Sequence, residues 1–459
     1  MISFPSSHGG AENRAAQDSG TGSTDVQVWG GVECTCNRVA DCYFDQMELS
    51  GHALRPNDLE RFHELGITAL RTGLVWERHH LDPSWKFADQ RLHWMREAGM
   101  RCIAGLVHHG SGPRHTSLLD PAFATELAAY ARQVAERYPW IDAYTPINEP
   151  NTTARFSGMY GIWYPHHRFR RSYLRALLVQ SKAIVLSMRE IRKVNPHAQL
   201  VQTEDLGTIH GTDELRSVWE LLKERRWIGF DLLCGRVDRN HPMFPFMRNE
   251  GALEKDILWF ADNPCPPDVI GVNYYPTSDR FLDHRPELYP PERGSAEGPF
   301  ADVEALRVKG AQVSGFGALL IEAWERYRTP VAITEVHLGD TVHQQIRWAA
   351  DARKGITQAR RRGAECQAIT FWALLGSFYW NQLVTQPNGY YEPGVFDVSS
   401  GSPQPTELAE IVAQIARGET PQHPALSEPG WWQREDRYMF PFENHAGNLD
   451  DDEPSQLAA

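Results

Sequence analysis

The chain has 459 residues, of which 41% are hydrophobic and 23% are charged, as in ordinary globular proteins. Its formal net charge of −13 argues against binding to nucleic acid or to an anionic membrane surface. No apolar run reaches the roughly 18 residues that a transmembrane helix needs, which argues against a membrane protein. This length allows two or three average domains or one large α/β barrel.

The two ends of the chain differ in composition from its middle. Residues 1–25 are rich in Gly, Ser and Ala without a hydrophobic period, which predicts a disordered segment. They contain no apolar stretch typical of a secretory signal, so we expect a cytoplasmic protein. Residues 419–459 contain several prolines and an acidic run. They predict a C-terminal extension that is partly disordered, with Trp431-Trp432 and the cluster at 438–440 able to dock on the body.

The seven cysteines are an odd number scattered along a long chain, which argues against a disulfide framework. We expect free thiols in a reducing compartment. Cys34, Cys36 and Cys42 suggest zinc only weakly, because no second pair of ligands follows at a finger-like spacing. The sequence therefore predicts neither a metal nor a cofactor.

Between residues 26 and 418, short apolar runs alternate with amphipathic helical stretches. One helix is predicted over 120–137, with Asp120 as its cap, and another over 405–417, with Gly418 beyond its end. Eight strands are predicted in chain order, at 26–32, 67–71, 101–108, 143–148, 199–204, 268–273, 330–335 and 368–373. Strands that alternate with helices predict an α/β fold with a parallel sheet, and eight such units predict a single (β/α)8 TIM barrel over 26–418.

Polar or aromatic residues recur where these strands end. They are Arg71, His108-His109, Asn148-Glu149, Glu204-Asp205, Asn273-Tyr274-Tyr275 and Glu335, and the eighth strand contains Trp372. In a TIM barrel the carboxyl ends of the strands surround one mouth, which carries the catalytic groups. Because charged side chains are costly inside the barrel, their recurrence predicts a shared polar cleft.

Glu149 and Glu335 are expected to face each other across this mouth, at the ends of the fourth and seventh strands. Cleavage of a glycosidic bond with retention uses two carboxyl groups about 5–5.5 Å apart, one as nucleophile and one as acid/base. The acid needs a raised pKa, which an apolar setting beside Trp372 and the charge of Glu335 would supply for Glu149. Arg71 is placed to keep Glu335 ionised.

Several motifs resemble those of the family 1 glycoside hydrolases, the β-glucosidase-like retaining barrels. TPINEP at 145–150 ends in the N-E-P of the acid/base motif T-x-N-E-P and so resembles it, and ITE at 333–335 resembles the start of the nucleophile motif. The spacing R-x4-W-x-R from Arg71, the motif G-x-N-Y-Y at 271–275, H-x3-P from His109 and the WALL segment from Trp372 follow the family's order. The match spans residues 28–400.

The resemblance implies a retaining, exo-acting β-glycosidase with Glu149 as acid/base and Glu335 as the residue that forms the covalent intermediate. Tyr275 would hydrogen-bond the nucleophile, and Asn37 falls where the family has a sugar-binding Gln. Further supporting or substrate-binding residues are expected to be Arg71, His109, Asn148, Asn273, Trp372, Glu204 and Trp380. Glu204 would bind sugar or pair with an arginine. Because neighbours on a strand face opposite sides, we expect only one of His108 and His109 to face the cleft, and we favour His109.

The chain also departs from the family pattern. Val336-His337 follows the nucleophile where the family has N-G, and Tyr379 replaces a Glu that binds outer sugar hydroxyls. Gly110 stands in place of a Trp, and Asn37 in place of the Gln. We therefore expect a divergent branch acting on a small carbohydrate or glycoside other than a plain β-glucoside, in an oligomeric state that the sequence leaves open. The alternatives are a transglycosylase that uses the same residues and a catalytically inactive sugar-binding barrel.

Overall fold

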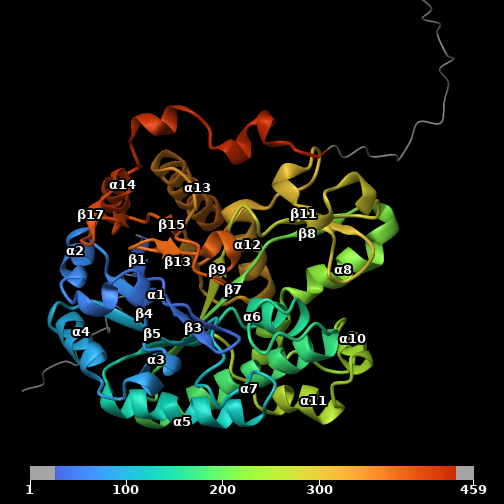
Figure 1. Cartoon of the computed structure of the whole chain (residues 1–459), viewed down its shortest axis with the longest axis horizontal. Coiled ribbons are helices and arrows are strands. Elements are labelled where there is room, and N and C mark those ends of the chain that lie inside the picture. Colours follow the sequence, from blue (N-terminus) through green and yellow to red (C-terminus); the bar gives the residue numbers. More distant parts are fainter. Residues whose placement is uncertain (1–25, 441–459) are drawn as a thin grey trace, which may run out of the picture.

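The computed structural model describes residues 26–440, so the predictions for 1–25 and for the end of the extension lie outside the described residues. Eight parallel strands close into a barrel in the order β1-β13-β12-β9-β7-β6-β5-β4, which confirms the predicted (β/α)8 architecture (Figure 1). The strands are β1 (Gln27–Gly31), β4 (Ala69–Gly73), β5 (Arg101–His108), β6 (Ala143–Asn148), β7 (Gln199–Asp205), β9 (Val269–Asn273), β12 (Val331–Val336) and β13 (Cys366–Phe371).

The barrel interior is filled by side chains rather than by solvent. Every residue of β6, β9 and β12 is buried, as expected for strands that are covered on both faces. Each strand contributes one residue to a small central cluster, in which the large Trp29 packs among short side chains. The cluster consists of Trp29, Ala69, Ile103, Ala143, Val201, Val269, Ala332 and Ala368. Alternation of large and small residues fills the barrel without voids, so that only the carboxyl ends of the strands remain for a site.

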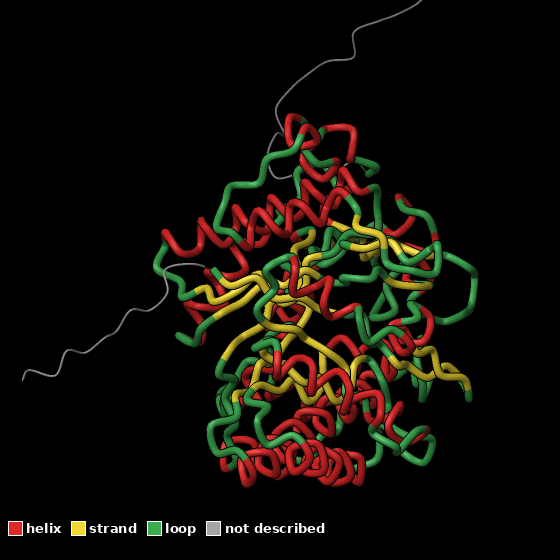
Figure 2. Tube along the Cα trace, turned by 90° about the vertical axis from the view of Figure 1, so that its left-hand side faces the viewer, coloured by secondary structure: helices red, strands yellow, loops and turns green. Residues whose placement is uncertain are grey.

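Helices surround the strands on the outside (Figure 2). They are α2 (Asp58–Glu64), α4 (Lys86–Glu97), α5 (Ala122–Arg137), α7 (Arg170–Val194), α9 (Ile228–Leu233), α11 (Glu254–Asp262), α12 (Gly315–Tyr327), α13 (Val342–Arg361) and α14 (Glu407–Ala416). The two helices predicted from sequence are α5 and α14. Asp120 accepts the backbone N–H of Ala122 at 2.9 Å, and Gly418 has a φ of 77°, so both end signals act as expected.

Short elements that the sequence did not predict follow the carboxyl ends of the barrel strands. One small sheet joins β8 (Ile209–Gly211), β10 (Arg280–Asp283) and β11 (Ala301–Glu304). Pairs are formed by β2 (Cys36–Val39) with β3 (Cys42–Asp45), by β14 (Ser377–Phe378) with β15 (Tyr391–Glu392) and by β16 (Phe396–Asp397) with β17 (Gln404–Pro405). Short helices there include α3 (Trp76–Leu81) and α6 (Pro150–Ala154).

Residues 419–440, here called the C-terminal strap, run from α14 past α13 toward β11 (Figure 1). The ring of Trp432 packs edge-on against Trp348 at 4.9 Å, and its indole N–H donates to Asp351 at 2.8 Å. Phe440 forms backbone hydrogen bonds with Arg307 and Lys309. The predicted docking of this segment on the body is therefore confirmed.

All seven cysteines lie within the described residues and are free thiols, as predicted. None of the helices within residues 26–440 is long and apolar enough to cross a bilayer.

Candidate active site

A cavity of about 730 Å³ opens at the carboxyl ends of the barrel strands. It is lined by six of the residues predicted from sequence, namely Glu149, Glu335, His109, Tyr275, Trp372 and Trp380. The other predicted residues, Arg71, Asn148, Asn273, Asn37 and Glu204, do not line it. The structure therefore brings Glu149 and Glu335 into one cavity together with four of the other predicted residues, and the remaining five lie outside its lining.

Glu335, in β12, is buried and has two hydrogen-bond donors. Arg71 Nη1 lies 3.3 Å from Glu335 Oε1, and the hydroxyl of Tyr275 donates to Glu335 Oε2 at 2.5 Å. Burial raises the pKa of Glu335 to about 7, while the charge of Arg71 and the hydrogen bond from Tyr275 oppose this rise. The nucleophile assigned from sequence thus has the cation and the donor that favour its ionised form.

Glu149 directly follows β6 and has no such cation. Its backbone φ of 46° lies in the left-handed region, which is rare for a non-glycine residue and common at functional sites. Asn273 Nδ2 donates to Glu149 Oε1 at 2.6 Å, and the orientation of this amide follows from its oxygen, which accepts from Thr334 at 2.6 Å. Burial and then the charge of Glu335 raise the pKa of Glu149 well above its usual range.

The two carboxyl groups therefore differ in the way that acid and nucleophile require. Both are at least 96% shielded from solvent, since Glu149 is 4% and Glu335 3% exposed. Only Glu335 has a guanidinium beside it, so Glu335 loses its proton first as pH rises. The charge left on Glu335 then keeps the proton on Glu149. Because the pair is coupled, this order belongs to the pair rather than to either residue alone.

Both His108 and His109 line the cavity, so the expectation that only one would face it was wrong. The strict alternation of a strand stops at His108, the last residue of β5, and His109 has a φ of 55° that turns its side chain back toward the mouth. The ring of His108 stacks on Trp372 with centroids 5.0 Å apart. His109 Nε2 lies 3.7 Å from Glu149 Oε2. Burial lowers the pKa of both rings, so both are neutral. Neither ring is therefore a cation that would favour the ionised form of Glu149.

Arg71 and Asn148 lie behind the cavity wall and fix the groups that do line it. The amide oxygen of Asn148 accepts from Arg71 Nη2 at 2.9 Å and from Thr203 Oγ1 at 2.7 Å. Its amide nitrogen consequently faces His108 Nε2, 3.1 Å away. This network connects the fourth strand to the arginine that contacts Glu335.

Glu204 and Asn37 hydrogen-bond other parts of the protein and do not line the cavity. Glu204 accepts the backbone N–H groups of Asn151 and Thr152 at 2.8 and 3.1 Å, so it caps α6, the helix that begins after Glu149. It pairs with backbone donors rather than with the sugar or the arginine that we considered. Asn37, in β2, donates its amide to the carbonyl of Val384 at 3.0 Å and so holds the loop after Trp380.

Glu33 is a third buried carboxylate in the cavity. Its Oε2 accepts the indole N–H groups of Trp372 and Trp380 at 3.3 and 3.2 Å, and its Oε1 accepts the N–H of Thr35 at 2.8 Å. Both indole donors are therefore occupied by the protein. Burial raises the pKa of Glu33 despite these hydrogen bonds.

Glu392, whose position the sequence did not locate, reaches the cavity from β15. Its Oε2 contacts His337 Nε2 at 3.2 Å and accepts from Ser377 Oγ at 3.4 Å. A side chain at Gly339 would bring its Cβ within 2.7 Å of this carboxyl group, so the glycine leaves room for Glu392. His337, which stands where the family motif has a Gly, thus contacts Glu392 here, whereas Tyr379 is not among the residues that line the cavity.

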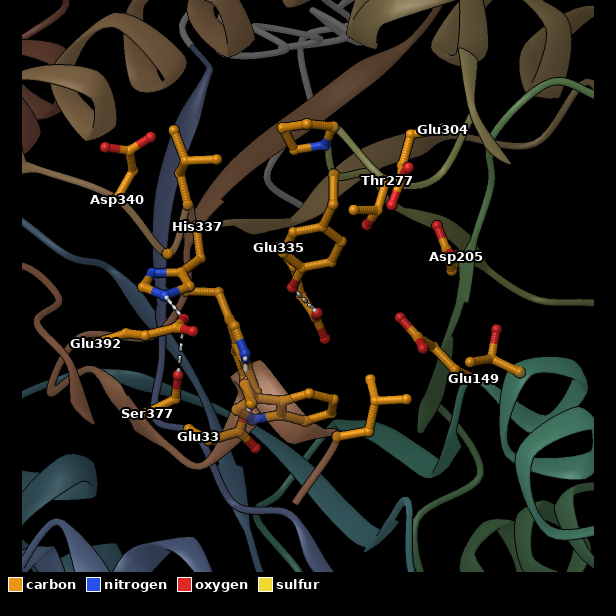
Figure 3. A pocket seen from close by; sticks show the side chains of 18 of the residues that line it. Glu33, Glu149, Asp205, Thr277, Glu304, Glu335, His337, Asp340, Ser377 and Glu392 are labelled. Carbon is orange, nitrogen blue, oxygen red and sulfur yellow. Dashed lines mark hydrogen bonds and ion pairs between the residues drawn. The ribbon is translucent and has the colours of Figure 1, made fainter. Parts of the chain in front are cut away.

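The cavity has two ends, with Glu335 between them (Figure 3). Glu149, Asp205, Thr277 and Glu304 lie toward one end, and Glu392, His337 and Ser377 toward the other (Figure 3). Asp205 was noted at a strand end, but Thr277 and Glu304 follow β9 and end β11, where the sequence carried no motif. Among residues 26–440, no cluster of three or more His, Cys, Asp or Glu side chains is arranged to hold a metal ion.

Comparison with known proteins finds β-glucosidases among the proteins similar to this chain. β-Glucosidase 47 of Arabidopsis thaliana is 23% identical to this chain, over 94% of the chain and 88% of that protein. A β-glucosidase from Thermotoga maritima in complex with methoxycarbonyl-substituted glucoimidazole superposes with a TM-score of 0.67 at 17% identity, covering 81% of this chain and 88% of that one.

A Thermotoga maritima family 1 glycoside hydrolase complexed with a cyclophellitol analogue transition state mimic gives the same TM-score, at 17% identity over 80% of this chain and 87% of that one. The resemblance to the family 1 glycoside hydrolases is confirmed. It is a distant one, and no model of a protein family matches the chain. The departures at Val336-His337 and Tyr379 agree with a divergent relative.

Proposed function

We propose that the protein is a retaining, exo-acting β-glycosidase. The observation that carries the proposal is the unequal pair of buried carboxyl groups at the barrel mouth, where Arg71 and Tyr275 favour the charge on Glu335, whereas the hydrogen bond to Glu149 comes from the uncharged amide of Asn273. Two of the similar proteins named above are β-glucosidases, which supports a β-glycoside as the substrate.

In the first step, ionised Glu335 attacks the anomeric carbon while Glu149 gives its proton to the glycosidic oxygen. The bond between the anomeric carbon and that oxygen breaks, and the aglycone leaves as a neutral alcohol. A glycosyl ester forms on Glu335, which removes the charge that had raised the pKa of Glu149. Arg71 and Tyr275 hold the attacking carboxylate in place throughout.

In the second step, Glu149 acts as the base. It takes a proton from water, whose oxygen attacks the anomeric carbon and releases Glu335 as a carboxylate. Two displacements at one carbon restore the original β configuration. Asn273 keeps Glu149 oriented in both of its protonation states, because its own amide is fixed by Thr334.

The proposal predicts that Glu335→Gly abolishes turnover of an aryl β-glycoside, by at least about 10⁴-fold as for loss of a covalent nucleophile. Azide or formate should restore part of the activity by entering the space left by the side chain and attacking in its place. Release of the aryl group, followed by absorbance with and without added azide, measures both effects. Glu410→Gln, which changes an exposed carboxylate on α14, serves as the control and should behave as the unaltered protein. Full turnover by Glu335→Gly would contradict the assignment.

A further inference from the structure

The C-terminal strap contributes two side chains, Trp431 and Met439, to the wall of the active-site cavity. This segment lies beyond the last barrel helix, α14, and is fixed at two points. Trp432 packs against Trp348 and bonds to Asp351, and Phe440 pairs with the backbone at Arg307. Because both neighbours are anchored, Trp431 and Met439 are held where they line the cavity.

These residues lie at the outer part of the cavity, away from its floor. Glu33 and Trp372, at the floor, are each 4% exposed, whereas Met439 is 61% exposed. The strap pairs with the segment that directly follows β11, so that Trp431 and Met439 stand next to Arg307 and close in sequence to Glu304. Glu304 lies on the side of Glu149 in Figure 3. Since Glu149 protonates the departing oxygen, that side receives the leaving group.

At this outer end an aromatic ring and a cation lie in the same cavity wall as the carboxylates of Glu304 and Asp205. The guanidinium of Arg307 lies 4.1 Å from the ring centroid of Trp431, a cation–π distance. Within the described part of the chain, no carboxylate lies in salt-bridge distance of Arg307, whereas the other arginine of the cavity, Arg293, pairs with Glu304 at 2.6 Å. Arg307 is therefore the cation there with charge available to a ligand.

Resting on the glycosidase function proposed above, we propose that Trp431 and Arg307 form an aglycone subsite for a flat aromatic leaving group that carries a carboxylate. The aromatic ring of the aglycone packs on the indole of Trp431 and the thioether of Met439, and its carboxylate pairs with Arg307. The C-terminal strap is in this view a part of the active site.

The test compares three substrates with one glycone, namely the glycosyl fluoride, the phenyl glycoside and the 3-carboxyphenyl glycoside. Fluoride has no ring to stack, so its kcat/KM reports the catalytic pair and the glycone alone. Trp431→Ala should lower kcat/KM for both aryl glycosides about five- to tenfold relative to the fluoride, through KM. Arg307→Gln should lower it about threefold for the carboxyphenyl glycoside and leave the phenyl glycoside as before.

Two further variants protect this comparison. Trp431→Phe keeps an aromatic ring and should recover most of the kcat/KM that Trp431→Ala loses on the aryl glycosides. If Trp431→Ala lost activity only because the strap had detached, a ring at this position would not restore the aryl glycosides selectively. Phe169→Ala removes a 67% exposed aromatic side chain outside the cavity and should change no ratio. Equal ratios of aryl to fluoride turnover in the unaltered protein and in Trp431→Ala would overturn the subsite.

Direct binding separates this proposal from the function on which it rests. Calorimetry with 3-hydroxybenzoate, the free aglycone, should show binding to the unaltered protein that weakens in both Trp431→Ala and Arg307→Gln. Absence of turnover on all three substrates together with this binding pattern would reject the glycosidase and keep the subsite. Turnover of the fluoride without binding of 3-hydroxybenzoate would keep the glycosidase and reject the subsite.

Discussion

At the scale of single residues, the two carboxyl groups proposed as catalytic, Glu149 and Glu335, are chemically alike and are made different by three neighbours. Arg71 and Tyr275 stabilise charge on Glu335, and the buried amide of Asn273 orients Glu149 without supplying a charge. Burial raises the pKa of both groups, because the charged form of each loses hydration. The neighbours then decide which carboxyl group ionises first.

This difference predicts the pH dependence of kcat/KM. Activity requires Glu335 ionised and Glu149 protonated, so it should rise as pH increases through about 7 and fall again at higher pH as Glu149 ionises. Tyr275→Phe removes a hydrogen bond that favours the charged form of Glu335, which raises its pKa and should move the acid limb upward by about one pH unit. Initial rates measured across pH check the direction, and a shift to lower pH would contradict the role of Tyr275.

At the scale of secondary-structure elements, short elements outside the barrel build the end of the cavity that Glu392, His337 and Ser377 line, here called the inner end. The pair β14–β15 supplies Ser377 and Glu392, and His337 directly follows β12. The indole N–H groups of Trp372 and Trp380 both donate to Glu33. No arginine or lysine lines this end among the described residues, since Arg293 and Arg307 belong to the outer end. It offers mainly acceptors, which suit a glycone that donates hydroxyl hydrogens.

We therefore predict that a panel of aryl β-glycosides with neutral glycones contains substrates and that the β-glucuronide is not cleaved, because its carboxylate would meet Glu33 and Glu392. Glu392→Gln keeps the shape but removes a charged acceptor, which should lower kcat/KM on the best neutral substrate about tenfold or more. Release of the aryl group measures both results, with Glu410→Gln as the matched control. Preferred cleavage of the glucuronide would contradict this view of the inner end.

Sequence patterns predicted the barrel well and its additions poorly. Each buried strand is an apolar run, so the eight barrel strands were located to within about two residues, and α5 and α14 had clear end signals. Glu149, Glu335 and Tyr275 could be predicted because each lies at or within two residues of the carboxyl end of such a strand. The sequence did not show that His108 lines the cavity together with His109, because that depends on the backbone turn at His109. The position of Glu392 could not be predicted, because it depends on the path of the loop after Trp380.

At the scale of the whole molecule, stability and chemistry occupy different ends of one barrel. Trp29 and its seven small or branched neighbours close the interior of the barrel, and the carboxyl ends of the strands carry the polar residues. The C-terminal strap spans from α14 to the segment after β11 (Figure 1). Two of its residues, Trp431 and Met439, line the cavity. At the carboxyl ends of the strands, the buried side chains of Glu335, Glu204 and Glu33 each have a hydrogen-bond donor, which offsets part of the cost of burying their charge.

The measurement that tests the central claim most directly is the trapping of the glycosyl-enzyme. A 2-deoxy-2-fluoro-β-glycosyl fluoride of the preferred sugar loses fluoride readily, but its intermediate hydrolyses slowly, because the fluorine at C2 destabilises the oxocarbenium-like transition state. Peptide mass spectrometry after proteolysis then locates the sugar. We predict one adduct, on Glu335, with none on Glu33 or Glu392. An adduct on either of those carboxylates, or inactivation without any adduct, would contradict the mechanism.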